Sequence, residues 1–322
     1  MSKEAGTATR SPLISVIMPC YNASPFLEES VGSVLGQSYA EVELIVVDDG
    51  STDGSVEVLE KLVAANAGRV QFFFQSRMGP FPARNHGLRH AKGALIAFLD
   101  ADDYWHPDFL ERMHTALVES HADLAYCGWQ NFGNGAPGLE PYIPPAYEAG
   151  DPVADFLRSC PWPIHAALVR RSIIDAVRGF SERRFSAMDY DLWLRILART
   201  RRIVRVPEVM AFYRWHARGQ VSSVKWRQVL DALVAQTDFI RDNPELVKHM
   251  LREKLHDLTQ GQVLRQAYRA VWRRDLDSAQ KLFRHVAGAR AFQPRDLHHV
   301  AAAMLPMPLY RRLIRLLDRS QP

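Results

Sequence analysis

The stretch Leu95–Pro107, LIAFLDADDYWHP, decides the fold that the sequence predicts. Its first five residues are apolar without alternation, which is typical of a strand buried on both faces in a parallel sheet. Three carboxylates follow within four positions, at Asp100, Asp102 and Asp103. Such close like charges repel unless a cation or strong hydrogen-bond donors neutralise them. Because ligands of open α/β sheets bind at the carboxyl ends of strands, the pattern indicates a divalent cation that holds a phosphorylated ligand. The alternative is local, with Asp102 or Asp103 capping a helix that starts near Pro107.

Three more apolar runs precede this strand and alternate with helical patterns. The expected strands are Leu13–Met18, Glu43–Val47 and Val70–Phe74. Three helices are expected between them: the first begins at Ser24 and Pro25, the second includes Val56–Val63, and the third covers about Ala83–Ala91. This alternation predicts right-handed βαβ units, hence an α/β fold with a mostly parallel sheet flanked by helices. The turn after the first strand, PCYNAS, has no glycine. That excludes the glycine-rich dinucleotide site of the dehydrogenases, and equally the glycine-rich loop of a nucleotidyltransferase.

Composition and charge suggest a cytoplasmic protein with two differently charged parts. The 322 residues include three cysteines without metal-ligand spacing, and their odd number argues for a reducing compartment. No apolar run has the length of a signal peptide core or a membrane span. Residues 261–322 carry twelve Lys/Arg and four Asp/Glu, a net +8, which leaves −4 for residues 1–260. No nucleic-acid-binding motif accompanies this basic tail, so a nucleic acid partner is not expected.

Four ordered motifs give the sequence a resemblance to a known family. They are VIMPCYN at Val16–Asn22, VVDDGSTD at Val46–Asp53, ARNHGL at Ala83–Leu88, and FLDADDYW at Phe98–Trp105. Together they resemble the family 2 glycosyltransferases of the GT-A fold. The resemblance extends through Gly179-Phe180, MDYDLWLR at Met188–Arg195, and YRWH at Tyr213–His216, and so covers about residues 12–220.

The resemblance implies a domain plan. A flexible N-terminus, 1–11, precedes a catalytic domain, 12–220, with a nucleotide-binding half, 12–106, and an acceptor-binding half, 107–220. A helical region, 221–322, follows. Its last helix, with leucines on one side and arginines on another, is expected either to contact an anionic membrane surface through residues 304–319 or to dock on its own domain. The first alternative would place the protein at the inner face of the cell membrane.

The turns after the first two strands are implied to hold the nucleotide. Pro19 offers backbone contacts, Tyr21 a ring face, and Asp48 a carboxylate for a base N–H. The alternative is that Asp48 and Asp49 only shape their turn, which is ordinary chemistry for Asp beside Gly. Arg84 is assigned either to a phosphate or to a solvated helix face. For Asp100 the expectation is a contact to ribose or sugar hydroxyls.

The remaining chemistry is implied at three positions. Asp102 would ligate Mg²⁺ or Mn²⁺, hard cations that bind carboxylates together with substrate phosphates. His216 would complete the metal site or touch the diphosphate, with Arg214, Ser222 and Ser223 as alternatives for the diphosphate. Asp189, near the start of a helix, would be the catalytic base, with Asp191 as its local rival.

The expected activity is sugar transfer, with inversion, from a nucleoside diphosphate sugar, UDP-sugar by default, to a glycan or lipid-linked acceptor in cell-surface polysaccharide assembly. Residues 130–165, rich in Gly and Pro, are expected to form acceptor loops, with Trp162 and His165 as candidate contacts. The family usually has an acid where this chain has Met188. A non-catalytic protein of the same fold that binds nucleotide sugars is therefore the alternative function.

Overall fold

The computed structural model describes residues 11–136, 138–181, 186–216 and 225–319, with side chains as far as Ile314 in the last segment. The chain forms two compact units. The first consists of Met1–Gly150, Trp162–Glu182 and Arg199–Ala217; the second consists of Asp151–Pro161, Arg183–Ala198 and Arg218–Pro322. The chain therefore enters the second unit three times. The flexible N-terminus expected at 1–11 lies outside the described residues except for Ser11.

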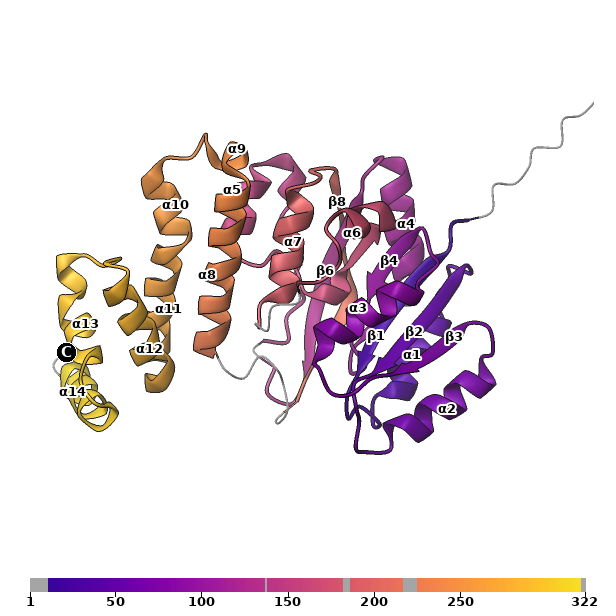
Figure 1. Cartoon of the computed structure of the whole chain (residues 1–322), viewed down its shortest axis with the longest axis horizontal. Coiled ribbons are helices and arrows are strands. Elements are labelled where there is room, and N and C mark those ends of the chain that lie inside the picture. Colours follow the sequence, from indigo (N-terminus) through magenta and orange to yellow (C-terminus); the bar gives the residue numbers. More distant parts are fainter. Residues whose placement is uncertain (1–10, 137, 182–185, 217–224, 320–322) are drawn as a thin grey trace, which may run out of the picture. The chain divides into compact units, whose positions relative to one another are not determined.

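The first unit is built on one eight-stranded sheet with the order β3-β2-β1-β4-β7-β6-β8-β5 (Figure 1). Its strands are β1 (Ile14–Cys20), β2 (Val42–Asp48), β3 (Val70–Phe74), β4 (Leu95–Phe98), β5 (Tyr104–Trp105), β6 (Leu124–Gly133), β7 (Ala167–Arg170) and β8 (Ile203–Trp215). The first four strands pair in parallel, with Ile17 of β1 opposite Ile45 of β2 and Phe98 of β4. The α/β prediction is confirmed, and its four expected strands match β1 to β4 closely.

The second half of the sheet is mixed in direction. β7 is antiparallel to β4 and to β6, whereas β6 and β8 run parallel over ten paired positions. The two-residue strand β5 pairs with β8 in the antiparallel direction. This arrangement brings the end of β8 beside the loop between β4 and β5, so the acidic stretch and the Tyr213–His216 motif lie together although more than a hundred residues separate them.

Helices pack on this sheet in the order expected from the sequence. They are α1 (Leu27–Leu35), α2 (Ser55–Ala65), α3 (Pro80–His90), α4 (Phe109–Glu119) and α6 (Arg171–Ala176), with short 3₁₀ turns η1 (Tyr147–Ala149) and η2 (Ile164–Ala166). Helix α3 lies close on the sheet, since a Cβ added at Gly87 would come within 2.6 Å of Ile17 Cγ2.

One expected helix start is wrong, and so is the alternative of a helix cap at Asp102 or Asp103. Helix α1 begins at Leu27, not at Ser24 and Pro25, because the Phe26 and Leu27 N–H groups both donate to the Ala23 carbonyl in a turn. The Ser24 N–H donates instead to Asp53 Oδ2 at 3.2 Å. Helix α4 has Asp108 at its N-cap, so neither Asp102 nor Asp103 caps it.

The second unit consists of helices, the later of which pack around an apolar core of their own, and this confirms the expected helical extension. They are α5 (Pro152–Arg158), α7 (Met188–Leu197), α8 (Lys225–Asp242), α9 (Pro244–Val247), α10 (Arg252–Leu258), α11 (Gln260–Trp272), α12 (Leu276–Gly288), η4 (Pro294–Asp296), α13 (Leu297–Ala303) and α14 (Met307–Arg319). The core includes Leu233, Val263, Phe283 and Tyr310. Among the described helices, none is both long and apolar enough to cross a bilayer.

Helix α14 contains most of the segment 304–319 that the sequence offered as a membrane contact. Its Tyr310 and Ile314 are almost fully buried in the core of the helical unit, and Met307 and Leu313 pack against that core. Leu309 of α14 stays 52% exposed, but the burial of Tyr310 and Ile314 favours the docked alternative for this helix.

Candidate functional site

Two strand-end turns in the first unit are bonded to each other. The Asn22 side-chain oxygen accepts from the Thr52 N–H at 2.7 Å, and the Asn22 N–H donates to Ser51 Oγ at 2.9 Å. The Ala23 N–H likewise donates to Ser55 Oγ at 2.9 Å. These contacts fix the turn after β1 against the turn after β2, so the two motifs expected to hold a nucleotide form one surface.

Asp48 and Asp49 are both buried and hold turns in place. Asp48 Oδ2 accepts from the N–H groups of Gly50 (3.1 Å) and Ser51 (3.0 Å), and its Oδ1 accepts from the Ser51 hydroxyl. The Asp49 carboxylate accepts from the Met78 and Gly79 N–H groups, each at 2.7 Å. The geometry therefore gives both residues the turn-shaping role that the sequence left open. Binding of a base N–H by Asp48 stays a prediction.

Tyr21 stands beyond β1 with 39% of its surface exposed. The Arg77 guanidinium carbon lies 3.2 Å from the centroid of its ring, a close cation–π contact. Pro19, by contrast, is a buried residue of β1 opposite Val47. Arg77 is a candidate site residue that the sequence did not indicate. It lies outside the motifs, just ahead of the Met78–Gly79 turn that Asp49 holds, and no local pattern marks it.

Arg84 is almost fully buried in α3 and forms an ion pair with Asp100 at the end of β4. The Arg84 guanidinium also lies 5.3 Å and 5.5 Å from the ring centroids of Phe81 and Phe180. The prediction of a solvated helix face for Arg84 is therefore wrong. Asp100 keeps about a quarter of its side chain exposed, 28%, so it can still meet a ligand.

The segment that carries Phe180 is clamped to α3. Asn85 Nδ2 donates to the Phe180 carbonyl at 3.0 Å, and Asn85 Oδ1 accepts from the Phe180 N–H at 2.8 Å. Gly179 makes the approach possible, because it has φ +66° and a Cβ there would lie 2.7 Å from Asn85 Oδ1. The pair Gly179-Phe180 therefore places the Phe180 ring beside the Arg84 guanidinium.

His216, directly after β8, brings its Nε2 to 2.8 Å from Asp102 Oδ2. The two side chains come from segments 114 residues apart, and the sequence analysis proposed both as metal ligands. Burial, and then the charge of Asp100, raise the pKa of Asp102 above its ordinary value. The contact with His216 acts in the opposite direction, because it favours the charged carboxylate.

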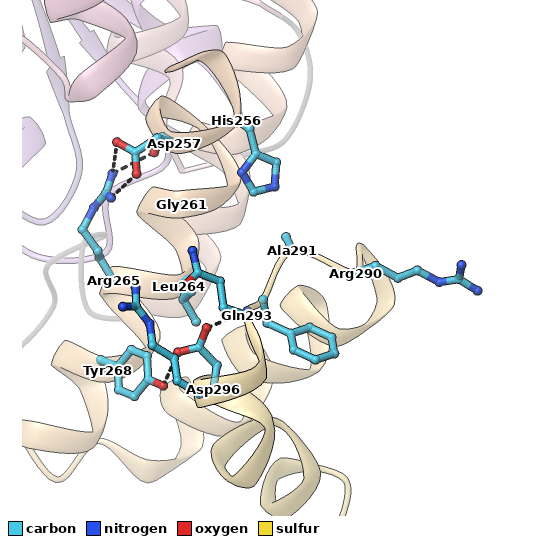
Figure 2. A pocket seen from close by; sticks show the side chains of 12 residues that line it. His256, Asp257, Gly261, Leu264, Arg265, Tyr268, Arg290, Ala291, Gln293 and Asp296 are labelled. Atoms are coloured by element: carbon cyan, nitrogen blue, oxygen red, sulfur yellow. Dashed lines mark hydrogen bonds and ion pairs between the residues drawn. The ribbon is translucent and has the colours of Figure 1, made fainter. Parts of the chain in front are cut away.

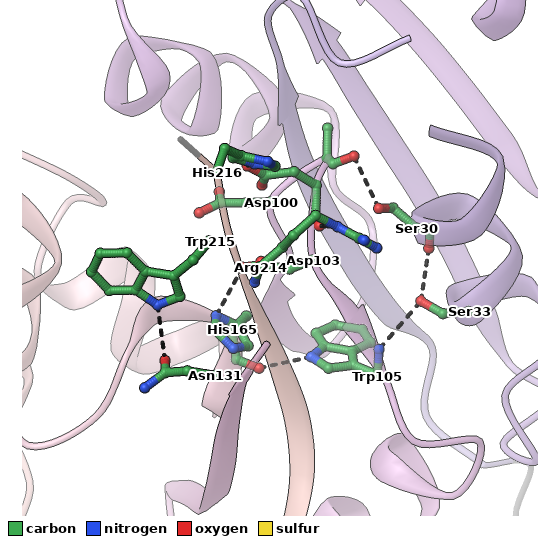
Figure 3. Close-up of polar contacts among 12 residues, drawn as sticks. Ser30, Ser33, Asp100, Asp103, Trp105, Asn131, His165, Arg214, Trp215 and His216 are labelled. Atoms are coloured by element: carbon green, nitrogen blue, oxygen red, sulfur yellow. Dashed lines mark hydrogen bonds and ion pairs between the residues drawn. The ribbon is translucent and has the colours of Figure 1, made fainter. Parts of the chain in front are cut away.

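Asp103 is fully buried and ties β8 to the acidic loop (Figure 3). Its Oδ1 accepts from the Arg214 N–H at 2.7 Å, and its Oδ2 lies 3.3 Å from His165 Nδ1. Arg214 Nε donates to the Asp102 carbonyl at 2.7 Å, and its guanidinium pairs with Glu29. Burial raises the pKa of Asp103 well above its ordinary value, and burial lowers the pKa of His165 to about 4.

The donor set fits a hard divalent cation. Asp102 supplies a carboxylate oxygen and His216 an imidazole nitrogen at one point, and nearby Asp100 adds negative charge that a cation would relieve. No cluster of three or more His, Cys, Asp or Glu side chains suited to a metal occurs among the described residues. Two protein ligands still fit Mg²⁺ or Mn²⁺ where substrate phosphates and water supply the rest.

The predicted acceptor contacts Trp162 and His165 are wrong, because both side chains are buried in the first unit. Trp162 stacks on Tyr126 with ring centroids 4.2 Å apart, and His165 stacks on Tyr213 at 5.5 Å. The neighbouring Tyr142 is 47% exposed and pairs with Trp129 through both backbone groups. Of the named candidates, Ser222 and Ser223 lie outside the described residues.

Asp189 is in the first turn of α7, in the second unit. Its Oδ1 accepts from the Tyr190 N–H at 2.9 Å, and about half-burial leaves part of its surface accessible. Asp191, the rival, pairs with Arg195 one turn later, with Nε to Oδ2 at 2.8 Å. The preceding residue Met188 is buried.

The helical unit has a hollow of about 540 Å³ beside α11 (Figure 2). Its two carboxylates hold the walls together: Asp257 pairs with Arg265 at 2.5 Å, and Asp296 Oδ1 accepts from the Tyr268 hydroxyl at 2.7 Å. Figure 2 shows Arg290 directed away from these contacts. The strand ends of the first unit therefore remain the stronger candidate for a metal and phosphate site.

Comparison with known proteins places this chain in a family. The family model described as "Glycosyl transferase family 2" matches residues 15–187. A putative teichuronic acid biosynthesis glycosyltransferase, TuaG of Bacillus subtilis, is 29% identical over 218 residues, which is 67% of this chain and 84% of TuaG. An uncharacterized glycosyltransferase of Haemophilus influenzae is 43% identical over 121 residues; the match spans 36% of this chain and about half, 48%, of that protein.

Solved structures share the fold. S. aureus TarS 1–349, in complex with UDP-GlcNAc, matches with a TM-score of 0.60 at 18% identity over 96% of this chain and 92% of TarS 1–349. The mannosyltransferase PcManGT of Pyrobaculum calidifontis, in complex with GDP-Man and Mn²⁺, also gives 0.60, at 21% identity, covering 95% of this chain and 84% of that one. With the strand-end motifs and the GT-A sheet, the family match shows that this chain belongs to glycosyl transferase family 2.

Proposed function

We propose that this chain is an inverting glycosyltransferase that moves a sugar from a nucleoside diphosphate sugar to a hydroxyl of a glycan or lipid-linked acceptor. UDP is the default nucleotide, and assembly of a cell-surface polysaccharide on the cytoplasmic side of the membrane is the expected setting. The single observation that carries the proposal is the meeting of Asp102 and His216 at 2.8 Å beside Asp100, at the carboxyl end of the parallel strands.

The donor would lie across the ends of β1, β2 and β4. The ring of Tyr21 with Arg77 provides a platform for a base, and the turn held by Asp48 provides backbone and hydroxyl groups beside it. Asp100, kept in place by Arg84, would bind ribose or sugar hydroxyls. Arg84 itself is too buried to reach a phosphate without movement, so its role in donor binding would act through Asp100. Structural neighbours with bound UDP-GlcNAc and GDP-Man support a donor of this class.

Asp102 and His216 would hold a divalent cation together with the diphosphate. When bound, such a cation stabilises the charge that develops on the leaving diphosphate. The protein contributes by fixing the two ligands through Asp103 and Arg214, so that little reorganisation is needed when the donor arrives. The complex of PcManGT with Mn²⁺ supports this assignment.

Asp189 would accept the proton of the attacking hydroxyl. The N-terminus of α7 favours a charged carboxylate, and the Tyr190 N–H donates to it directly. Asp191 remains the rival candidate, and it forms an ion pair with Arg195 one turn later. One base and no protein nucleophile give a single displacement, which inverts the anomeric centre. The exposed Tyr142, with its ring in the 130–165 segment, would offer the acceptor sugar a face.

Matched variants test the base. Asp189→Asn is expected to lower the rate of sugar transfer, or of donor hydrolysis where no acceptor is known, by at least about 100-fold, the usual value of a general base. Asp191→Asn, two residues away, is the control and should keep most of the activity. Equal activity of the two variants would remove Asp189 from the mechanism.

A ligand screen separates the enzyme from the non-catalytic alternative. UDP- and GDP-sugars, each with and without Mn²⁺, should raise the melting temperature, because a ligand that binds the native state stabilises it. Metal-dependent stabilisation of wild type together with turnover supports the enzyme. Binding without turnover in both wild type and Asp189→Asn would favour a nucleotide-sugar-binding protein that lacks catalysis.

A further inference from the structure

One end of the helical unit gathers basic side chains. Here α8 begins, α11 ends and α12 begins, and a small hollow is lined jointly by Lys225, Arg269 and Arg273. We call this surface the basic end. It consists of these three residues together with their close neighbours on the same helices and turn, Arg227, Trp272, Arg274 and Lys281.

The acids that the structure describes at this end are themselves engaged. Asp275 lines the same hollow, but it caps α12, since its Oδ1 accepts from the Ser278 N–H at 3.2 Å. Asp277 pairs with Lys281 at 2.8 Å. Among the residues that the structure describes, neither Arg269 nor Arg273 has an acidic partner. The basic end is thus complementary to an anionic surface.

The same end exposes a large apolar ring. Trp272, the last residue of α11, is 86% exposed and lies between Arg269 and Arg273 in the sequence. Trp226 in α8 is also partly exposed, but two cations cover its ring. Lys281 Nζ lies 4.5 Å from the ring centroid, and the guanidinium carbon of Arg227 lies 5.3 Å from it. An exposed indole with guanidinium groups on either side suits the boundary between water and lipid, where the ring enters the headgroup layer and the cations face phosphates.

We propose that the basic end is the surface by which this protein rests on an anionic lipid bilayer, with Trp272 inserted at the headgroup level. The choice of a membrane over a nucleic acid rests on the proposed function, since a lipid-linked acceptor would lie at such a surface. The surface differs from residues 304–319, of which Tyr310 and Ile314 are buried in the core of the helical unit.

Flotation of the full-length chain with lipid vesicles tests the proposal. Wild type is expected to float with phosphatidylcholine vesicles that contain about one third phosphatidylglycerol, and to stay behind with phosphatidylcholine alone. Each basic residue near such a surface contributes about fivefold in partition, so the double variant Arg269→Gln with Arg273→Gln should bind about 25-fold more weakly. Trp272→Ala should also reduce binding several-fold.

Two control variants belong to the same unit. Arg290→Gln with Arg295→Gln removes two exposed arginines elsewhere, and Leu251→Ala removes a side chain that is 74% exposed. Both are expected to bind vesicles like wild type. A separate readout reports insertion: brominated acyl chains should quench the tryptophan fluorescence of wild type, and Trp272→Phe should lose most of that quenching while it still floats. All these residues are exposed, so circular dichroism should show unchanged folding.

Several results would overturn the proposal. The proposal fails if wild type remains soluble beside anionic vesicles, or if the control arginine pair weakens flotation as much as the Arg269 and Arg273 pair does. Preferential binding of an oligonucleotide, lost in the arginine variants and unaffected by Trp272→Ala, would identify a polyanion site instead. Sugar transfer by wild type to a soluble acceptor is measured in parallel. If wild type transfers sugar but does not float, the membrane surface is rejected and the proposed function stands. If wild type floats but does not transfer sugar, the proposed function is rejected and the membrane surface stands.

Discussion

Replacing Asp103 by alanine should weaken metal binding although Asp103 is not expected to touch the metal. Alanine removes the acceptor of the Arg214 N–H, and it removes the carboxylate next to His165. Arg214 is two residues before His216, so the end of β8 would keep only the bond from Arg214 Nε to the Asp102 carbonyl, and His216 would be held less firmly against Asp102. Partners that orient metal ligands typically change metal affinity 10- to 100-fold, so we expect a loss of about that size, or about 1.4 to 2.7 kcal/mol.

The same change should lower stability. A buried N–H without a partner costs about 1 to 3 kcal/mol, and the space left by the carboxylate adds to this cost. Asp103→Asn is the conservative partner variant, since its amide oxygen can still accept from the Arg214 N–H. It should bind Mn²⁺ with UDP within a few-fold of wild type. Isothermal titration measures the Mn²⁺ affinity, and urea unfolding measures the free energy of unfolding.

A second buried aspartate supplies the control. Asp123 accepts hydrogen bonds from Arg202 Nε at 3.0 Å and Nη2 at 2.7 Å. Arg202 directly precedes β8, so this contact lies at the opposite end of the strand from His216. Asp123→Ala should lose comparable stability but keep its Mn²⁺ affinity. If Asp103→Ala is destabilised yet binds Mn²⁺ within twofold of wild type, Asp103 does not position His216 and the reasoning is refuted.

Two further predictions concern the same unit. Gly179→Ala should lower the free energy of urea unfolding by about 2 to 4 kcal/mol, because the added Cβ stands on a left-handed backbone and displaces the Asn85 side chain. The control is Gly135→Ala, at φ +88° with nothing within 4 Å of the added Cβ, which should lose only about 1 to 2 kcal/mol. Equal losses in the two variants would contradict the role of the Asn85 hydrogen bonds. His165 has its pKa lowered to about 4 in the folded chain, so between pH 6.5 and 4 the unfolded chain binds the extra proton and stability is lost as the pH falls. The destabilisation caused by His165→Gln should therefore shrink by about 2 kcal/mol between pH 7.5 and 4.5, measured by urea unfolding at each pH. A constant difference would mean that the pKa of His165 is the same in the folded and unfolded chains, and a difference that grows as the pH falls would mean that His165 is charged in the fold.

The first half of the fold was predictable from the sequence because its strands are continuous buried runs. All seven residues of β1 and all seven of β2 are buried, and β4 reads as an unbroken apolar segment. The start of α1 was not predictable, since Ser24 and Pro25 form a good helix start in isolation. Their real conformation depends on Asp53, almost thirty residues later, which takes the Ser24 N–H.

The second half depends on contacts between distant segments, which local patterns do not reveal. β7 has only four residues, and its place between β4 and β6 follows from pairing Leu95 with Arg170. For the candidate site, the sequence indicated Asp102 and His216, and the structure brings them together. The sequence could not indicate that Arg84 pairs with Asp100, that Arg77 covers Tyr21, or that His165 is buried, because each of these features depends on a tertiary neighbour.

The repeated passage of the chain into the helical unit has a consequence for synthesis. Gln236 in α8 donates to the Leu157 carbonyl at 2.7 Å, and Asp231 Oδ2 accepts from the Ser186 N–H at 2.7 Å. The partners of α5 and of the segment before α7 therefore leave the ribosome long after those segments do. Until α8 emerges, α5 and the segment before α7 keep apolar side chains exposed. Nascent chains stalled near residue 220 should therefore depend most on chaperones, and a gene shortened there should yield aggregated product.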